Sequence, residues 1–162
     1  MKKINDNKVK IFGKDYSLNI MYKYIKTPKL NLQKEIIEIL LPYKYKKIPK
    51  DTIIKLLIQK MYEAIAEKEL DTIMEKVRVT LNFAPENFEI ARINKVLGKC
   101  DKDKIIINPD IVMYPKETIE YIILHEFCLA KCKKHSKKFY EMVQSYIPNY
   151  KSYAYEVAGM QY

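Results

Sequence analysis

The chain has 162 residues, 48% of them hydrophobic and 31% charged, which is typical of a soluble globular protein and argues against disorder. Its formal net charge is +10, but the lysines are spread along the whole chain, so a solvated surface is favoured over a dedicated nucleic-acid site, and nucleic acid stays an alternative partner. Three cysteines, no apolar run of membrane-spanning length and no secretory signal lead us to expect free thiols, no membrane partner and a cytoplasmic location.

The N-terminal third is predicted to be a small β-meander. Apolar and polar residues alternate on both sides of Gly13, which predicts a β-hairpin over residues 8–24. The apolar run at residues 36–41, closed by Pro42, predicts a further short strand. From Asp51 to Leu81 apolar residues recur at helical spacing, which indicates either two helices or one long helix.

The C-terminal half is predicted to be a β-hairpin followed by helices. Residues 88–96 and 104–108 are expected as the two strands, with the turn at residues 98–103. A helix follows from Pro115, and its broad apolar face indicates that it lies in the core. Another helix is expected from His135 until Pro148, and a short one within residues 152–162. The predicted class is α+β in a single domain spanning residues 1–162.

The chemistry of the chain concentrates in residues 114–140, which contain both histidines. Two histidines at i and i+4 of a helix can bind one zinc ion, with the glutamate after the first acting as general base. His125 and Glu126 fit the first two positions, but Leu129 stands where the second histidine is expected. His135, ten residues after His125, suits a ligand that arrives after the helix ends. On spacing alone, a buried histidine with a hydrogen-bonded partner is the simpler interpretation.

The sequence on both sides of the His-Glu pair resembles the YgjP-like metallopeptidase family, whose members are SprT-like zincins of minimal size. The resemblance covers roughly the whole chain and rests on the segments VLGKC, KIIIN, the lead-in to His-Glu and the segment after it. Matching residues are Gly98, Cys100, Asn108, Pro115, Ile119, Tyr121, Ile122, His125, Glu126, His135, Ser136, Phe139 and Pro148.

This resemblance implies a zincin-like fold and a zinc-dependent metallohydrolase that acts on peptides or proteins. His125 and His135 would bind Zn²⁺, and the catalytic Glu126 would activate a zinc-bound water. By the same resemblance, three further residues would lie near the site; these are Cys100, Asn108 and Tyr121.

Leu129 departs from the family pattern because it removes a metal ligand. Cys128, three residues after His125, is the candidate replacement, since thiolate binds zinc well, with apolar packing as the alternative. Cys132 lies about 10 Å along the helix axis from His125, too far to share one ion. A site with two histidines would bind zinc weakly, which leaves metal occupancy open.

Three functions are left open by the sequence. The first is a zinc-dependent metallohydrolase whose activity Leu129 impairs. The second is a catalytically inactive zincin scaffold that binds nucleic acid or protein, an idea motivated by the positive charge and by the resemblance to SprT-like proteins. The third is a nucleotide pyrophosphatase in which Lys99, Lys131 and Lys134 meet the phosphates.

Overall fold

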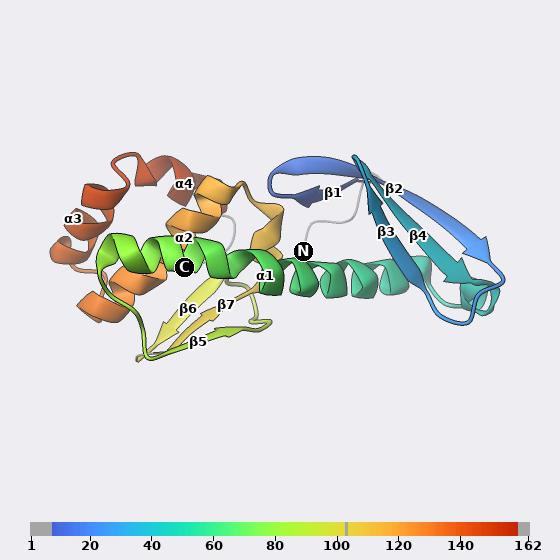
Figure 1. Cartoon of the computed structure of the whole chain (residues 1–162), viewed down its shortest axis with the longest axis horizontal. Coiled ribbons are helices and arrows are strands. Elements are labelled where there is room, and N and C mark those ends of the chain that lie inside the picture. Colours follow the sequence, from blue (N-terminus) through green and yellow to red (C-terminus); the bar gives the residue numbers. More distant parts are fainter. Residues whose placement is uncertain (1–7, 103, 159–162) are drawn as a thin grey trace.

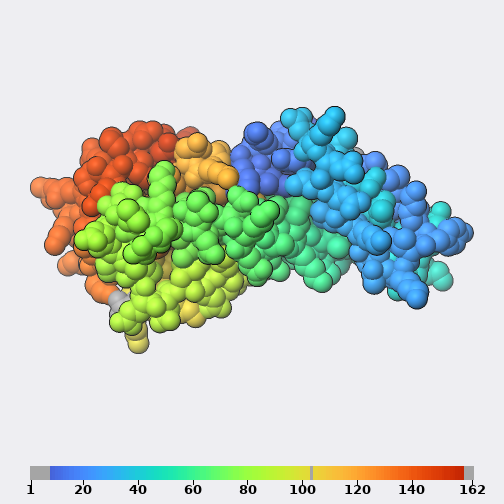
Figure 2. Space-filling model, viewed as in Figure 1, coloured from blue at the N-terminus to red at the C-terminus, as the bar shows by residue number. Residues whose placement is uncertain are grey.

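One long helix organises the molecule. The computed structural model describes residues 8–102 and 104–158. Helix α1 (Lys50–Leu81) has 32 residues and runs through most of the elongated body, as Figures 1 and 2 show. It is one continuous helix, one of the two arrangements that the periodicity allowed. It ends at Asn82, whose left-handed conformation (φ 44°) lets its N–H reach the carbonyls of Arg78 and Val79.

The first sheet lies over the N-terminal half of α1 (Figure 1) and has the order β1-β2-β4-β3. Its strands are β1 (Lys8–Ile11), β2 (Lys14–Lys23), β3 (Lys29–Gln33) and β4 (Ile36–Pro42). The predicted hairpin is confirmed, with Gly13 at φ 79° in its turn, and the predicted strand at residues 36–41 is confirmed as β4. The meander is wrong, because β2 and β4 pair in parallel and β3 pairs antiparallel to β4.

The second sheet lies beside the C-terminal half of α1 and has the order β5-β7-β6. Its strands are β5 (Asn87–Ile90), β6 (Gly98–Asp101) and β7 (Lys104–Ile107). The predicted strand over residues 88–96 is too long, because β5 ends at Ile90. The hairpin is formed by β6 and β7, and β5 pairs with β7 in parallel. Residues 98–101, which we expected in a turn, are therefore a strand.

The loop between β5 and β6 looked like a strand because it contains apolar residues. Asn108, which is buried, holds this loop: its side-chain amide donates to the carbonyls of Ile93 (2.9 Å) and Val96 (3.0 Å). The side-chain oxygen of Asn108 accepts from the N–H of Asp110 at 3.1 Å and so begins the short helix η2 (Pro109–Met113). Asn108 thus has a structural role in the hairpin region.

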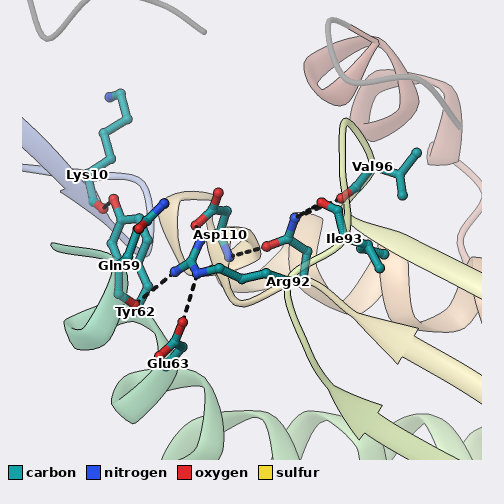
Figure 3. A network of polar contacts seen from close by, with 9 residues as sticks. Lys10, Gln59, Tyr62, Glu63, Arg92, Ile93, Val96 and Asp110 are labelled. Carbon is teal, nitrogen blue, oxygen red and sulfur yellow. Dashed lines mark hydrogen bonds and ion pairs between the residues drawn. The ribbon is translucent and has the colours of Figure 1, made fainter. Parts of the chain in front are cut away.

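Arg92 fastens the same loop to α1 (Figure 3). Its guanidinium contacts the carboxylates of Glu63 and Asp110, both at 2.7 Å, and donates to the carbonyl of Gln59 at 2.9 Å. In the same view, the Tyr62 hydroxyl of α1 donates to the carbonyl of Lys10 in β1 at 2.7 Å. Helix α1 therefore has polar contacts with the N-terminal hairpin and with the loop after β5, and Arg92 of that loop links it to η2.

The C-terminal part is helical, as predicted. It contains α2 (Lys116–Cys132), α3 (Lys137–Tyr146) and α4 (Tyr150–Val157). Helix α2 lies in the core, as its apolar face predicted, and α4 begins two residues before the predicted start at Ser152. The rest of the predicted terminal helix, residues 159–162, falls outside the described residues. The α+β class is confirmed, and no helix among the described residues is long and apolar enough to cross a membrane.

Candidate metal centre

Helix α2 carries the His-Glu pair into the protein core. His125 is 6% exposed and Glu126 is 2% exposed. The helix ends at Lys133, which adopts a left-handed conformation (φ 62°) and donates its N–H to the carbonyl of Leu129 at 2.7 Å. The chain then turns back, so that His135 lies against α2. The two histidines, ten positions apart in sequence, are brought together as their spacing suggested.

The Nε2 atoms of His125 and His135 are 3.1 Å apart. Two imidazoles can approach so closely as a neutral hydrogen-bonded pair, or with both lone pairs directed at one cation. Two nitrogen ligands of a tetrahedral zinc ion, each about 2.0–2.1 Å from the metal, are separated by about 3.3 Å. The observed separation is close to this value. The histidine pair therefore fits two positions of a divalent metal site.

The pKa of His125 agrees with this interpretation. Burial, with a smaller contribution from the neighbouring His135, lowers the pKa of His125 to about 4. The imidazole is therefore neutral at neutral pH. A neutral ring has a lone pair to offer to a metal ion or to a hydrogen-bond donor.

Glu126 is the second component of the site. Its Oε2 atom is buried without a hydrogen-bond partner among the described residues. Burial raises the pKa of Glu126 to about 7, although a hydrogen bond from the backbone N–H of Cys100 acts in the opposite direction. A carboxylate with such a pKa can both accept and release a proton near neutral pH, which suits a general base.

Gly98 makes room for this carboxylate. A Cβ atom at position 98 would lie 2.8 Å from Cγ and 3.0 Å from Oε1 of Glu126. Strand β6 therefore supplies two features at Glu126: the N–H of Cys100 and the open space at Gly98. The sequence singled out both residues through the family resemblance but did not give them these roles.

Among the described residues, the two histidines are the candidate ligands, and no clear third ligand accompanies them. Within residues 8–102 and 104–158, no cluster of three or more His, Cys, Asp or Glu side chains could hold a metal ion. Leu129 lies half-buried one turn after His125. Cys128 is fully buried in the core, and burial raises the pKa of its thiol to about 12, which opposes the thiolate form that a metal requires.

Aromatic rings enclose the histidine pair. Phe139 of α3 makes T-shaped contacts with both imidazoles, with its ring centroid 4.9 Å from that of His125 and 4.8 Å from that of His135. Tyr121, one turn before His125, lies 5.9 Å from it and stacks on Tyr150 at 6.4 Å. Tyr121 thus lies near His125. These rings restrict the access of water to His125 from the α3 and α4 side.

An open pocket of about 330 Å³ lies next to His135. Its lining residues are Cys100, Lys102, Leu129, Lys133, Lys134 and His135. Of the three lysines chosen from the sequence, only Lys134 is among them. Lys99 pairs with Asp101 at 3.7 Å, and Lys131 lies over the ring of Phe83. The sequence did not identify Lys102 and Lys133 as pocket residues, because individual lysines are not distinctive in a chain that is rich in lysine.

A core helix thus carries a buried His-Glu pair, with a second histidine facing it and a small sheet beside it. The family model described as "YgjP-like, metallopeptidase domain" matches residues 1–157. The chain therefore belongs to the YgjP-like metallopeptidase family, and the resemblance seen in the sequence is confirmed.

Solved structures agree on the fold. The crystal structure of the metallopeptidase zymogen of abylysin from Pyrococcus abyssi is similar to this chain, with a TM-score of 0.50 and 18% sequence identity. The match covers 54% of this chain and 90% of that one. No curated protein matches the sequence.

Proposed function

We propose that this protein is a metallohydrolase that binds a divalent metal ion, zinc by family precedent, through His125 and His135 and acts on peptide bonds. Two observations carry the proposal: the Nε2 atoms of the histidines converge to 3.1 Å, and the buried Oε2 atom of Glu126, next to His125 in sequence, has no hydrogen-bond partner among the described residues. A buried polar atom without a hydrogen-bond partner lowers the stability of the fold, and one reason to retain such an atom is a catalytic role. An acceptor in this place is what proton transfer at the site requires.

Each residue has a defined task in this proposal. A bound divalent ion would supply Lewis acidity toward a carbonyl oxygen. His125, neutral because of its burial, offers a lone pair, and His135 offers the second from the edge of the pocket. Glu126 accepts a proton from water and returns it to the leaving group. The N–H of Cys100 orients the carboxylate, and the aromatic ring of Phe139 fixes both imidazoles.

Leu129 determines how strongly the metal binds. With two protein ligands, the remaining ligands must come from solvent or substrate, so binding is weaker than at a site with three. Leu129→His restores the helical ligand at a half-buried position where little repacking is needed. We expect this variant to bind zinc at least about tenfold more tightly than the natural sequence.

Zinc affinity, measured by competition with a chromophoric chelator, tests the proposal. The expected order is Leu129→His tightest, the natural sequence next, and His125→Ala weakest. In a fluorogenic peptide assay, Leu129→His should be the more active form, and Glu126→Gln should abolish that activity without changing zinc affinity much. Equal zinc affinity for the natural sequence and His125→Ala would exclude the metal site and leave a non-catalytic scaffold as the function.

A second candidate keeps the hydrolytic chemistry and changes the bond. Lys102, Lys133 and Lys134 surround the pocket next to His135, and this positive surface favours a phosphate-bearing substrate such as a nucleoside triphosphate. Release of phosphate or pyrophosphate from nucleoside triphosphates measures this activity directly. Lys134→Gln should raise KM for such a substrate, whereas hydrolysis of a neutral peptide should not change. Activity on peptides alone would exclude this candidate.

A further inference from the structure

A cluster of tyrosines and lysines lies at the end of the first sheet, far from the histidine site. We call it the tyrosine–lysine tip. It occupies the end of β2, the residue after it, and the short helix η1 (Tyr43–Lys47) that follows β4. Figures 1 and 2 show this region at the right-hand end of the molecule, whereas α2 and α3 lie toward the other end. The tip consists of Tyr22, Tyr24, Tyr43, Lys44, Lys46 and Lys47.

The parallel pairing of β2 and β4 brings its rings together. Lys23 is opposite Pro42 in the register, so the residues that follow each strand, Tyr24 and Tyr43, are neighbours. Their ring centroids are 4.5 Å apart, and Tyr22 stacks on Tyr43 at 6.3 Å with an interplanar angle of 28°. Tyr24 is 94% exposed and therefore presents most of its ring to solvent. The ring is therefore accessible to a ligand.

Lysines surround these rings. The Lys46 ammonium lies 4.8 Å from the ring centre of Tyr43 and 5.4 Å from that of Tyr22. Residues 16–34 and 39–50 together contain eight lysines and no aspartate or glutamate, and the four residues between these ranges include Glu35 and Glu38. None of these eight lysines forms an ion pair with another described residue, in contrast to Lys76, Lys104 and Lys116 elsewhere in the chain. The positive charge at the tip is therefore locally uncompensated.

We propose that the tyrosine–lysine tip binds single-stranded nucleic acid. Exposed aromatic rings stack with unpaired bases irrespective of sequence, and neighbouring lysines bind the phosphates. Tyr24 is the stacking surface, and Lys44, Lys46 and Lys47 are the phosphate contacts. Duplexes have no exposed base faces, so they should bind less tightly. This function is separate from the metal centre and does not depend on metal.

Fluorescence anisotropy with the full chain tests the proposal. The probes are fluorescein-labelled single-stranded oligonucleotides, oligo(dT) and oligo(U), and a duplex of equal length, all in the presence of a chelator. Single strands should bind more tightly than the duplex. Tyr24→Ala, which leaves the charge unchanged, should weaken single-strand binding by at least about fivefold, and Tyr24→Trp should restore it. The matched control is Tyr155→Ala, since Tyr155 is also highly exposed (85%) but belongs to α4.

Salt dependence separates the tip from the overall charge. The triple variant Lys44→Gln, Lys46→Gln, Lys47→Gln should reduce the slope of log affinity against log salt by about 2. The same number of lysines removed elsewhere, as Lys68→Gln, Lys138→Gln, Lys151→Gln, should change the slope much less.

Three results would overturn the proposal. The first is equal affinity of Tyr24→Ala and the natural sequence for single strands. The second is an equal loss in both triple variants, which would indicate non-specific attraction by net charge. The third is binding to phosphatidylserine vesicles that depends on Tyr24, without binding to oligonucleotides, which would assign the tip to a membrane surface.

Discussion

Glu126 and Gly98 are far apart in sequence but depend on each other in the fold. The carboxylate is buried, its Oε2 atom lacks a partner among the described residues, and Gly98 provides the space for its side chain. Burial of an acidic group without full hydrogen bonding lowers the free energy of unfolding. The site is therefore expected to reduce the stability of the fold that contains it.

Gly98→Ala should destabilise the protein through a collision with Glu126. The new Cβ would lie 2.8 Å from Cγ of Glu126, and overpacking of this kind costs about 1–3 kcal/mol. Chemical denaturation gives the free energy of unfolding. In a Glu126→Ala background the colliding atoms are absent, so Gly98→Ala should cost much less there. An equal cost in both backgrounds would assign the effect to the backbone of β6.

Glu126→Gln should stabilise the metal-free protein, and more so at alkaline pH. Folding raises the pKa of Glu126 from 4.5 to about 7, so as the pH rises the carboxyl loses its proton at a lower pH in the unfolded chain than in the folded protein. The resulting loss of stability is absent below pH 4.5, grows as the pH rises, and reaches about 3 kcal/mol above pH 7. Denaturation at pH 5 and pH 8 in a chelator measures it. A stability difference between the two proteins that does not vary with pH would contradict the raised pKa.

The sequence was informative about the site because its main residues are close together in the chain. His125 and Glu126 share a helix, and His135 follows its end, so that spacing alone suggested their meeting. Their catalytic and ligand roles stay predictions. The environment of Cys128 could not be deduced in this way, since a helical wheel gives a direction from the axis but not the elements that pack there. The core position of this thiol depends on tertiary contacts.

At the scale of elements, strands were predicted better than their pairing. Alternation located the β1–β2 hairpin, and an apolar run located β4, whose residues Ile37, Ile39 and Leu41 are buried. β3 was missed because four of its five residues are exposed and give only a weak pattern. β3 follows β2 in the chain but lies at the edge of the sheet, so β4 returns between them and pairs with β2 in parallel. No local sequence pattern predicts this arrangement. The same limitation applies to β5, which pairs in parallel with β7 across a crossover loop.

The Arg92 network should be important for holding that crossover loop. Arg92→Met removes contacts to Glu63, Asp110 and the Gln59 carbonyl, and we expect a loss of about 1–2 kcal/mol in the free energy of unfolding. Arg78→Met is the matched control, because Arg78 pairs only with the exposed Glu75 in the same helix among described residues, and it should cost less than Arg92→Met. Similar losses in the two variants would argue against a structural role of the network.

At the scale of the whole molecule, α1 connects the two sheets. Buried residues from both sheets and from α1 belong to one hydrophobic core cluster, which includes Ile39 of β4, Leu70 of α1 and Ile105 of β7. Most of the stability of a helix within a protein comes from tertiary packing of its apolar face, so the order of α1 depends on its contacts with both sheets. The two halves are therefore expected to unfold cooperatively.

Leu70→Ala tests this coupling. Leu70 is fully buried, and its truncation should cost about 2–4 kcal/mol. Hydrogen exchange should show the same loss of protection in peptides from β4 and from α2. Leu56→Ala, at a site of α1 that is 53% exposed, should change little. Loss of protection confined to the C-terminal half would mean that the halves unfold independently.

The position of Leu129 bears on how a single substitution, in evolution or in the laboratory, could change metal binding. It is half-buried, packs against the core on one side and lines an open pocket on the other. Under the proposed function, exchange of leucine and histidine at this position changes the number of metal ligands. A single substitution at the rim of the pocket would then add or remove metal dependence.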